Sequence, residues 1–205
     1  MSWNKYFIVI LNVEPLALNE LVRMTGYGEI LSFSEKMDFR RASNKDYEGI
    51  GFGVFDGNFW IVSPDQTEKF FAKEPSILEK NICKKFPQNT IIAAAENGTV
   101  DAFGINLIRN GKRIRVTSGA FGNEYYYEFG QQLNIEKEML TEVEKELSKR
   151  AKIEIIKNEG KNGVKDYLRF ESLSRVPFSL LSSLVGKSIE DIHDENPEFS
   201  IYRKK

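Results

Sequence analysis

The chain has 205 residues, of which 41% are hydrophobic and 12% aromatic. A chain of this length and apolar content is near the size that one hydrophobic core serves, so we expect a single domain over residues 1–205. The 29 basic and 30 acidic residues nearly cancel. This balance argues against an intrinsically disordered chain, and it disfavours nucleic acid as a partner because no net positive charge attracts a phosphate backbone.

Cysteine and histidine each occur once, as Cys83 and His193. One cysteine makes no internal disulfide, and the two residues are too few for a zinc site of the usual Cys/His kind. We therefore expect no metal, no cofactor and a location in the reducing cytoplasm. The apolar run at residues 6–11 is too short to cross a bilayer, so no membrane segment is expected.

The first elements are a strand, a helix and a second strand. The continuous apolar run at residues 7–11 predicts a strand that is covered on both faces and therefore central to its sheet. A helix is expected over residues 15–25, because Pro15 suits a first helical turn and Gly26 suits a helix end. Weak alternation of apolar and polar residues predicts a strand at residues 28–33.

The dipeptide Asp56-Gly57 lies between two β-type segments, residues 50–55 and 59–62. Asp-Gly suits a two-residue type I′ turn, whose twist matches that of paired strands, so these segments are expected to form a hairpin.

Two short helices are expected next. Ser63 and Pro64 predict a helix over residues 64–72, with the serine as its cap and the proline in its first turn. Ser76 and Glu79 have the spacing of a capping box, in which the glutamate side chain reaches back to the start of the helix. This second helix is expected to end before Pro87.

A second hairpin is expected at the dipeptide Asn110-Gly111. A strand at residues 90–95 and an extended pattern at residues 100–107 precede it, and residues 112–117 return from it. The aromatic residues 125–129 would complete an antiparallel meander. Together with the helices, these strands predict an α+β fold, in which a mainly antiparallel sheet packs against several helices.

The last third of the chain is predicted to contain two helices. Apolar residues recur every four positions over residues 135–147, with Asn134 as the cap. We expect a strand at residues 152–156 and a polar, glycine-bearing loop at residues 158–163. An apolar helix at residues 178–185 would end at Gly186, and the polar segment 187–205 is expected to be less ordered.

Three glycines alternate with apolar residues at Gly49, Gly51 and Gly53. In a strand they share one face, which would be bare backbone. Such a face either packs closely against a neighbouring element, which is the commoner use, or lines a ligand groove. The spacing matches neither a dinucleotide-binding loop nor a P-loop.

Basic residues gather at the second hairpin, as Arg109, Lys112, Arg113 and Arg115. Strand alternation places Arg113 and Arg115 on one wet face, where guanidinium groups could hold a phosphate or a carboxylate. Solvated charges that protect a sheet edge are the commoner use of such residues. The same two readings apply to the basic residues Lys36, Arg40 and Arg41.

Structural roles are the simplest interpretation of the other ionisable residues. Glu96 and Asp101 flank an Asn-Gly turn and could form an acid/base pair, although turn-flanking surface acids are commoner. His193 lies among acidic residues and is expected to be solvated. Cys83 is expected to fill space in the core.

We hypothesise that this is a non-catalytic interaction or regulatory domain that binds another protein or a second copy of itself. The hypothesis depends on the lack of any recognisable nucleophile–base set, metal cluster or phosphate loop in a foldable sequence. The alternative is a small-molecule-binding protein or small enzyme that acts on an anionic metabolite. Its candidate ligand-binding residues are the three strand glycines and the four basic residues of the second hairpin, Gly49, Gly51, Gly53, Arg109, Lys112, Arg113 and Arg115.

Overall fold

The computed structural model describes residues 4–28, 30–43, 49–120 and 127–204. Nine strands of these residues form one antiparallel sheet in the order β2-β9-β3-β4-β1-β5-β6-β7-β8. The strands are β1 (Asn4–Ile10), β2 (Leu31–Asp38), β3 (Ile50–Phe55), β4 (Asn58–Val62), β5 (Ile91–Asn97), β6 (Ala102–Arg109), β7 (Lys112–Ala120), β8 (Tyr127–Gly130) and β9 (Glu198–Lys204). The helices are α1 (Leu18–Met24), α2 (Phe39–Ala42), α3 (Pro64–Phe70), α4 (Ile77–Lys85), α5 (Asn134–Glu146), α6 (Lys149–Val185) and α7 (Ile189–Glu195). The predicted α+β class is confirmed.

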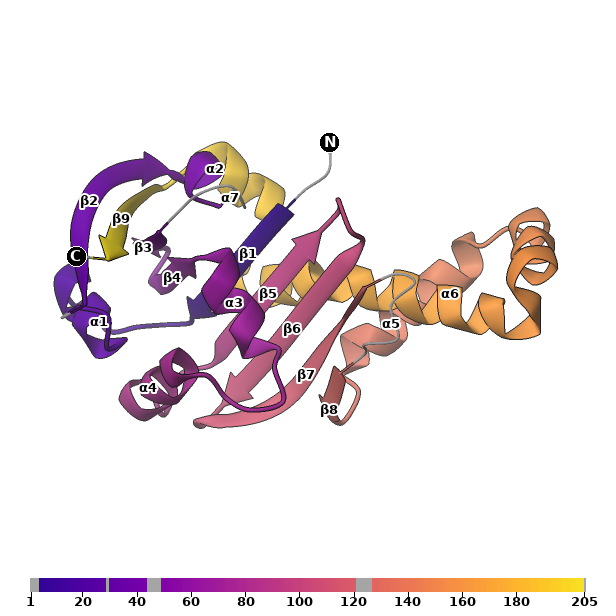
Figure 1. Cartoon of the computed structure of the whole chain (residues 1–205), viewed down its shortest axis with the longest axis horizontal. Helices are drawn as coiled ribbons and strands as arrows, with labels where there is room; N and C mark the ends of the chain where they lie inside the picture. Colours follow the sequence, from indigo (N-terminus) through magenta and orange to yellow (C-terminus); the bar gives the residue numbers. More distant parts are fainter. Residues whose placement is uncertain (1–3, 29, 44–48, 121–126, 205) are drawn as a thin grey trace.

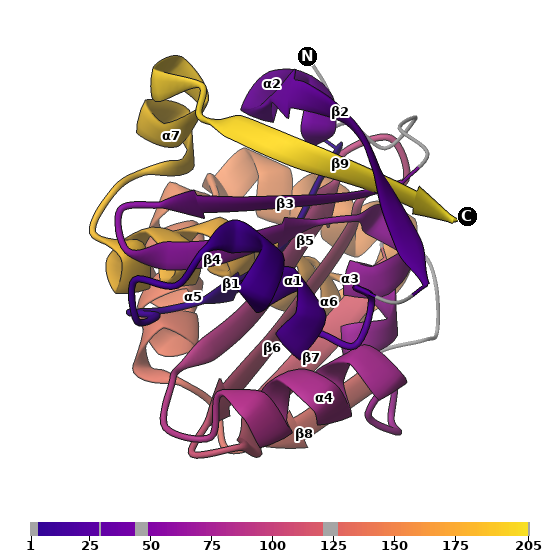
Figure 2. The same ribbon diagram turned by 90° about the vertical axis from the view of Figure 1, so that its left-hand side faces the viewer.

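The central strand β1 is buried on both faces, as its apolar sequence predicts. Ile8 and Ile10 pack into one core cluster with side chains from α1 and α4, whereas Phe7 and Val9 pack into a second cluster with side chains from α2, α6 and α7. Figure 1 shows α3 in front of the sheet and α6 behind it, and Figure 2 shows the twist of the sheet between β9 and β7. The protein therefore has three layers, with helices on both sides of the sheet.

Both predicted two-residue hairpins are confirmed. Asp56 and Gly57 have φ angles of 49° and 70°, and Asn110 and Gly111 have φ angles of 52° and 66°. Two consecutive positive φ angles define the type I′ turn, which glycine adopts freely and which asparagine and aspartate tolerate. The hairpins connect β3 to β4 and β6 to β7.

The predicted capping box at α4 forms only in half. The Ser76 hydroxyl accepts a hydrogen bond from the backbone N–H of Glu79 at 3.1 Å, as expected. The Glu79 side chain binds Arg113 of β7. The Glu79 carboxylate, which the sequence predicts to bind the start of the helix, is therefore bound by the charged Arg113 instead.

The predicted strand at residues 152–156 is wrong, because these residues are helical. The loop predicted at residues 158–163 is also wrong in extent, since only Gly160 leaves the helical conformation, with φ 77° and ψ −175°. Gly160 divides α6 into two helical segments that meet at a sharp turn (Figure 1). The isoleucines here are β-branched and favour strands, but this local preference is weak, and the residues form part of the long helix α6, which as a whole contacts α5.

The C-terminal segment, expected to be less ordered, forms α7 and β9. β9 lies between β2 and β3, so it is an interior strand of the sheet. Ile189, Ile192, Phe199 and Ile201 of this segment are buried in the second core cluster, and Tyr202 is buried in the first. Five apolar side chains spread over a polar segment are too sparse for a clear periodic signal, yet they suffice to anchor one helix and one strand.

Three predicted boundaries shift in the structure. The strand predicted at residues 28–33 begins at Leu31 and continues to Asp38. The cap of α5 is Leu133, whose backbone N–H donates to the Glu136 carboxylate at 3.0 Å, and Asn134 is the first helical residue. Of the predicted aromatic strand at residues 125–129, the last three residues lie in β8, and Tyr125 and Tyr126 lie outside the described residues.

Replacing Phe199 with alanine tests whether β9 is part of the core. Phe199 is 1% exposed, so Phe199→Ala should lower the free energy of unfolding in urea by about 3–5 kcal/mol. Val54→Ala, at a 47% exposed position of the neighbouring strand β3, is the control and should cost less than about 1 kcal/mol. Equal, small losses for both variants would show that the C-terminal strand is not needed for the stability of the sheet.

Candidate functional site

The glycine face of β3 is largely covered by β9. A Cβ atom at Gly53 would lie 3.0 Å from the Phe199 ring, and one at Gly51 would lie 3.2 Å from Ile201 Cδ1. Close packing therefore accounts for these two glycines. Gly49 instead borders a cavity of about 490 Å³, together with residues that include Tyr27.

The two predicted halves of a ligand site do not meet. Four strands, β4, β1, β5 and β6, separate β3 from β7. At about 4.8 Å per strand, the glycines and the arginines are roughly 24 Å apart. Any ligand-binding role must therefore belong to one group or the other.

A β-bulge also separates the two central arginines. Arg113 lies opposite Ile108, and Arg115 lies opposite Leu107, so Ile114 is an extra residue in β7. Arg113 is consequently on the face that α4 covers, and Arg115 is on the face of α5 and α6. The prediction that both share one wet face is wrong, because simple alternation fails at a bulge. Arg109 and Lys112 are exposed at the end of the hairpin.

Arg113 is engaged in structural contacts. Its Nε and Nη2 donate to the two carboxylate oxygens of Glu79, each at 2.6 Å. Its Nη1 donates to the carbonyl oxygens of Ala72 and Lys73 at 2.7 and 3.0 Å. Hydrogen bonding and attraction from Glu79 outweigh burial and raise the pKa of Arg113. This guanidinium therefore fixes β7 to α4 and to the connection that precedes it.

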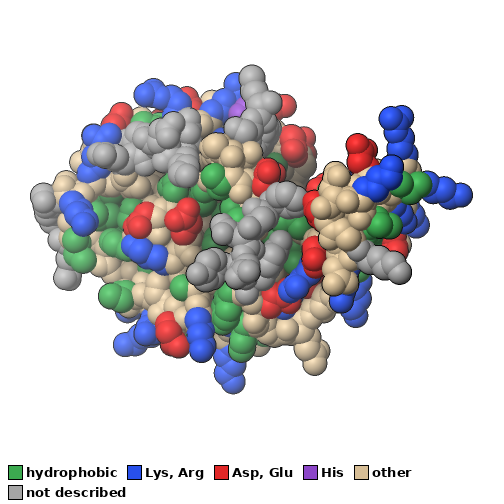
Figure 3. Space-filling view, turned by 45° about the vertical axis from the view of Figure 1, so that its right-hand side comes forward, with side chains coloured by type: hydrophobic (Ala, Val, Ile, Leu, Met, Phe, Trp, Pro, Cys, Tyr) green, Lys and Arg blue, Asp and Glu red, His purple; other side chains and the backbone are tan. Residues whose placement is uncertain are grey.

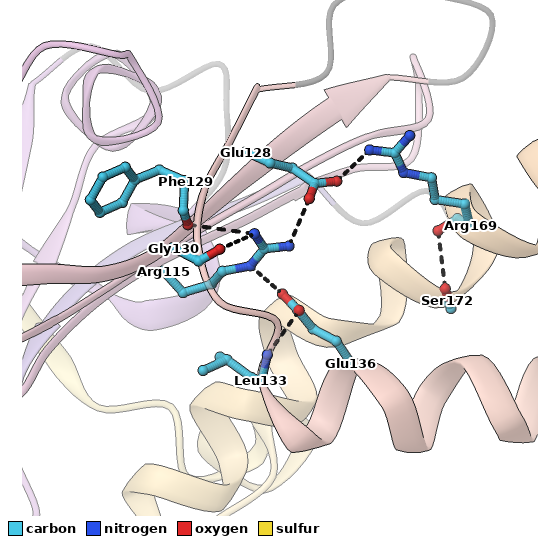
Figure 4. Close-up of polar contacts among 8 residues, drawn as sticks. All are labelled: Arg115, Glu128, Phe129, Gly130, Leu133, Glu136, Arg169 and Ser172. Atoms are coloured by element: carbon cyan, nitrogen blue, oxygen red, sulfur yellow. Dashed lines mark hydrogen bonds and ion pairs between the residues drawn. The ribbon is translucent and has the colours of Figure 1, made fainter.

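Arg115 lies at the centre of a buried polar network (Figure 4). Its Nε donates to Glu136 Oε1 at 2.8 Å, and its Nη2 donates to Glu128 Oε2 at 3.1 Å. Its Nη1 donates to the carbonyl oxygens of Phe129 and Gly130. Burial opposes the charge of Arg115, but these carboxylates outweigh that effect and raise its pKa. Glu136 is fully buried in the first turn of α5, where the helix dipole also favours its negative charge.

Glu128 connects this network to α6. Figure 4 shows its carboxylate between the guanidinium groups of Arg115 and Arg169. Burial raises the pKa of Glu128, but the hydrogen bonds from Arg169 and Arg115 outweigh burial, so the pKa is lowered overall. The network thus joins β7, β8, α5 and α6 through charged side chains.

A cleft of about 760 Å³ lies beside this network. One part of its wall is apolar and comes from α5 and α6, namely Leu140, Val164, Leu168 and Leu173. The other part is polar and contains Arg115, Glu128, Gln132, Glu144, Lys165, Arg169 and Ser172. The volume falls in the range of small-molecule sites. Of the seven predicted ligand-binding residues, Arg115 borders this cleft and Gly49 borders the smaller cavity.

The remaining sequence candidates lie apart from this cleft. Glu96 and Asp101 border a cavity of about 280 Å³. The pKa of Glu96 is raised, mainly by burial and further by repulsion from the carboxylates of Glu190 and Glu171. In α7, the Nδ1 atom of His193 lies 3.6 Å from Oδ1 of Asp194. Burial and the nearby Glu79 raise the pKa of the Cys83 thiol to about 11, which suits a packing role.

The other basic candidates lie near acids of the C-terminal segment. Lys36 Nζ lies 2.6 Å from Glu198 Oε1, and Arg40 Nη2 lies 3.5 Å from Asp194 Oδ1. The Arg41 backbone N–H donates to the Asp38 side chain. Within the described residues, no cluster of three or more His, Cys, Asp or Glu side chains could hold a metal ion. No helix among them has the length and apolar character needed to cross a membrane.

Residues 149–165 form the far end of a helical projection, and we name them the arm tip. α5 and the first segment of α6 extend beyond β8, away from the rest of the sheet (Figure 1). Ile153 and Ile156 of the arm tip are 56% and 43% exposed. Lys and Arg side chains gather around the same end of the molecule (Figure 3). The sequence predicts a strand at residues 152–156, so it does not predict this surface. In the helix that the structure contains, Ile153 and Ile156 are three residues apart and lie on one face.

No family model, curated protein or solved structure matches this chain.

Removing Arg115 should destabilise the protein strongly. Arg115→Met leaves the buried Glu136 carboxylate without its charged partner, so we expect a loss of about 3–5 kcal/mol in the free energy of unfolding. The double variant Arg115→Met with Glu136→Met should recover much of this loss in urea denaturation. If the double variant is no more stable than the single one, an unpaired buried charge is not the cause.

Stability should depend on pH through Glu128. Because its folded pKa is lowered, ionised Glu128 stabilises the protein above its unfolded pKa, and this contribution is lost as the pH falls through the folded pKa. The stability difference between the wild type and Glu128→Gln should therefore be largest near about pH 6 and shrink toward about pH 3. Glu142→Gln, an exposed position on α5, measures the general effect of removing one carboxylate. A difference that grows with acidity would contradict this assignment.

Proposed function

We propose that this protein is a non-catalytic interaction or regulatory domain of the cytoplasm that binds another protein through the arm tip. The observation that carries the proposal is the pair of exposed isoleucines, Ile153 and Ile156, on a helix that projects from the body of the molecule. They are three residues apart and share one helix face, which is the spacing that helical anchors use in protein interfaces.

The polar residues of the body support this proposal indirectly. Arg113 and Arg115, which resemble a ligand site in the sequence, are engaged with buried glutamates. They hold helices to the sheet, so they are poorly placed to turn toward a ligand. The arm tip, in contrast, exposes apolar side chains without a structural need that the fold explains.

A small-molecule-binding protein or small enzyme that acts on an anionic metabolite is the second candidate function. The cleft of about 760 Å³ favours it, because Lys165 and Arg169 lie four residues apart on α6 and both border the cleft. The cleft also contains Glu128 and Glu144, which oppose the binding of an anion. Protein binding through the arm tip is therefore the better supported function.

The isoleucine pair provides the test. A tagged full-length chain is used to capture partners from an extract of its native host, and the identified partner is purified and titrated against it. The double variant Ile153→Glu with Ile156→Glu should bind this partner at least about tenfold more weakly, because it removes the apolar contact and places charge there. Light scattering reports whether the captured partner is a second copy of the same chain.

The control changes two exposed apolar residues elsewhere. Ile77→Glu with Val100→Glu introduces the same change in charge at positions that are 80% and 56% exposed. This control should bind the partner as the wild type does. Equal binding by the Ile153→Glu and Ile156→Glu variant, or a strictly monomeric chain that retains no partner, overturns the proposed function.

A further inference from the structure

The chemistry of the arm tip narrows the kind of partner. Residues 149–165 contain six basic and two acidic residues, in a chain whose net charge is −1. The remainder of the chain is therefore net acidic. Such local separation of charge creates a positive potential at the arm tip, although the whole molecule is almost neutral.

The basic residues surround the isoleucine pair on the first segment of α6. Lys149 and Lys157 lie four residues before and after Ile153, and Lys152 lies four residues before Ile156. Residues four apart are neighbours on a helix surface. Each exposed isoleucine therefore has at least one lysine beside it. Glu159 also lies three residues after Ile156, so the surface combines an apolar centre with a mainly positive border.

These positive charges are not neutralised within the described part of the chain. Among the described residues, no carboxylate lies within ion-pair distance of Lys149, Lys152 or Lys157, and the same holds for Arg150. Two of the five glutamates of the neighbouring α5 pair with arginines outside the arm tip. Glu136 pairs with Arg115, and Glu146 pairs with Arg175. Positive charge at the arm tip thus remains available to a partner.

We infer that the partner presents an acidic, amphipathic helix to the arm tip. This inference rests on the proposed function and names the chemistry of its partner. Carboxylates on the partner would pair with the lysines, and an apolar stripe between them would cover Ile153 and Ile156. The two helices would pack side by side with their apolar rows in contact.

Other anionic partners fit this surface less well. A phosphate backbone would pair with the lysines but leave both isoleucines exposed, and residues 149–165 contain no aromatic side chain on which a base could stack. Helices that lie in a membrane surface bury a long apolar face, whereas this segment exposes two isoleucines within a single turn. An acidic protein helix matches both the charge and the small apolar centre.

Synthetic helical peptides of about 20 residues test this inference by fluorescence anisotropy with the full-length chain. Three peptides share one leucine face and carry glutamate, glutamine or lysine on the other face, and a fourth combines glutamate with alanine in place of leucine. The glutamate–leucine peptide should bind at least about tenfold more tightly than the other three. Its binding should weaken as sodium chloride rises from about 50 to about 300 mM.

Charge reversal provides a matched set of variants. The double variant Lys149→Glu with Lys157→Glu should bind the glutamate–leucine peptide more weakly than the wild type does, and it should bind the lysine–leucine peptide more tightly. Lys84→Glu with Lys85→Glu, at exposed positions on α4, is the control and should bind all four peptides as the wild type does. Circular dichroism checks that each variant is folded, and Ile153→Ser with Ile156→Ser tests the apolar contact without adding charge.

Equal binding of the glutamine–leucine and glutamate–leucine peptides overturns the inference, as does unchanged binding by the charge-reversal variant. Tighter binding of an RNA or DNA duplex, or of vesicles containing phosphatidylserine, also overturns it if the same lysines are required. The two proposals fail in different ways. A native partner that needs both isoleucines but has no acidic contact surface removes only this inference, whereas a partner that needs neither isoleucine removes the proposed function.

Discussion

The rest of the structure depends on the need to cover both faces of β1. Its side chains point alternately into two core clusters, and each cluster requires helices over one face of the sheet. The N-terminal helices α1, α3 and α4 cover one face, and α2, α6 and α7 cover the other. The second segment of α6 packs on the sheet through Val176, Leu180 and Leu181, while its first segment extends beyond the sheet edge (Figure 1).

The bulge in β7 determines what the arginines do. If β7 were a regular strand with no bulge at Ile114, Arg113 and Arg115 would lie on one face and form the basic patch that the alternating sequence predicts. With it, each arginine reaches a different helical layer and pairs with a buried glutamate. The bulge thus replaces a possible anion site with two structural connections, one on each side of the sheet.

Local rules predict the parts of the fold that local interactions determine. The central strand, the two type I′ hairpins and helices α3 and α4 follow from apolar runs, turn dipeptides and caps, and all are present. The failures lie where distant contacts decide. Residues 152–156 have strand-like isoleucines but are part of helix α6, and β9 pairs with strands that lie about 150–170 residues earlier in the chain. The cleft and the arm tip could not be predicted for the same reason, because both require the correct path of α6.

The charged network and the arm tip are physically linked. α5 and the first segment of α6 leave the sheet, so they need attachments other than the main core. Arg115 holds the start of α5 through Glu136, Arg169 holds α6 to β8 through Glu128, and Arg175 joins the two helices through Glu146. Each pair constrains the relative positions of the elements that it joins, although an ion pair of this kind is by itself weak evidence of added stability. Arg115, which suggests a ligand site in the sequence, therefore also has a structural role: through Glu136 it positions α5, which leads to the segment that exposes Ile153 and Ile156.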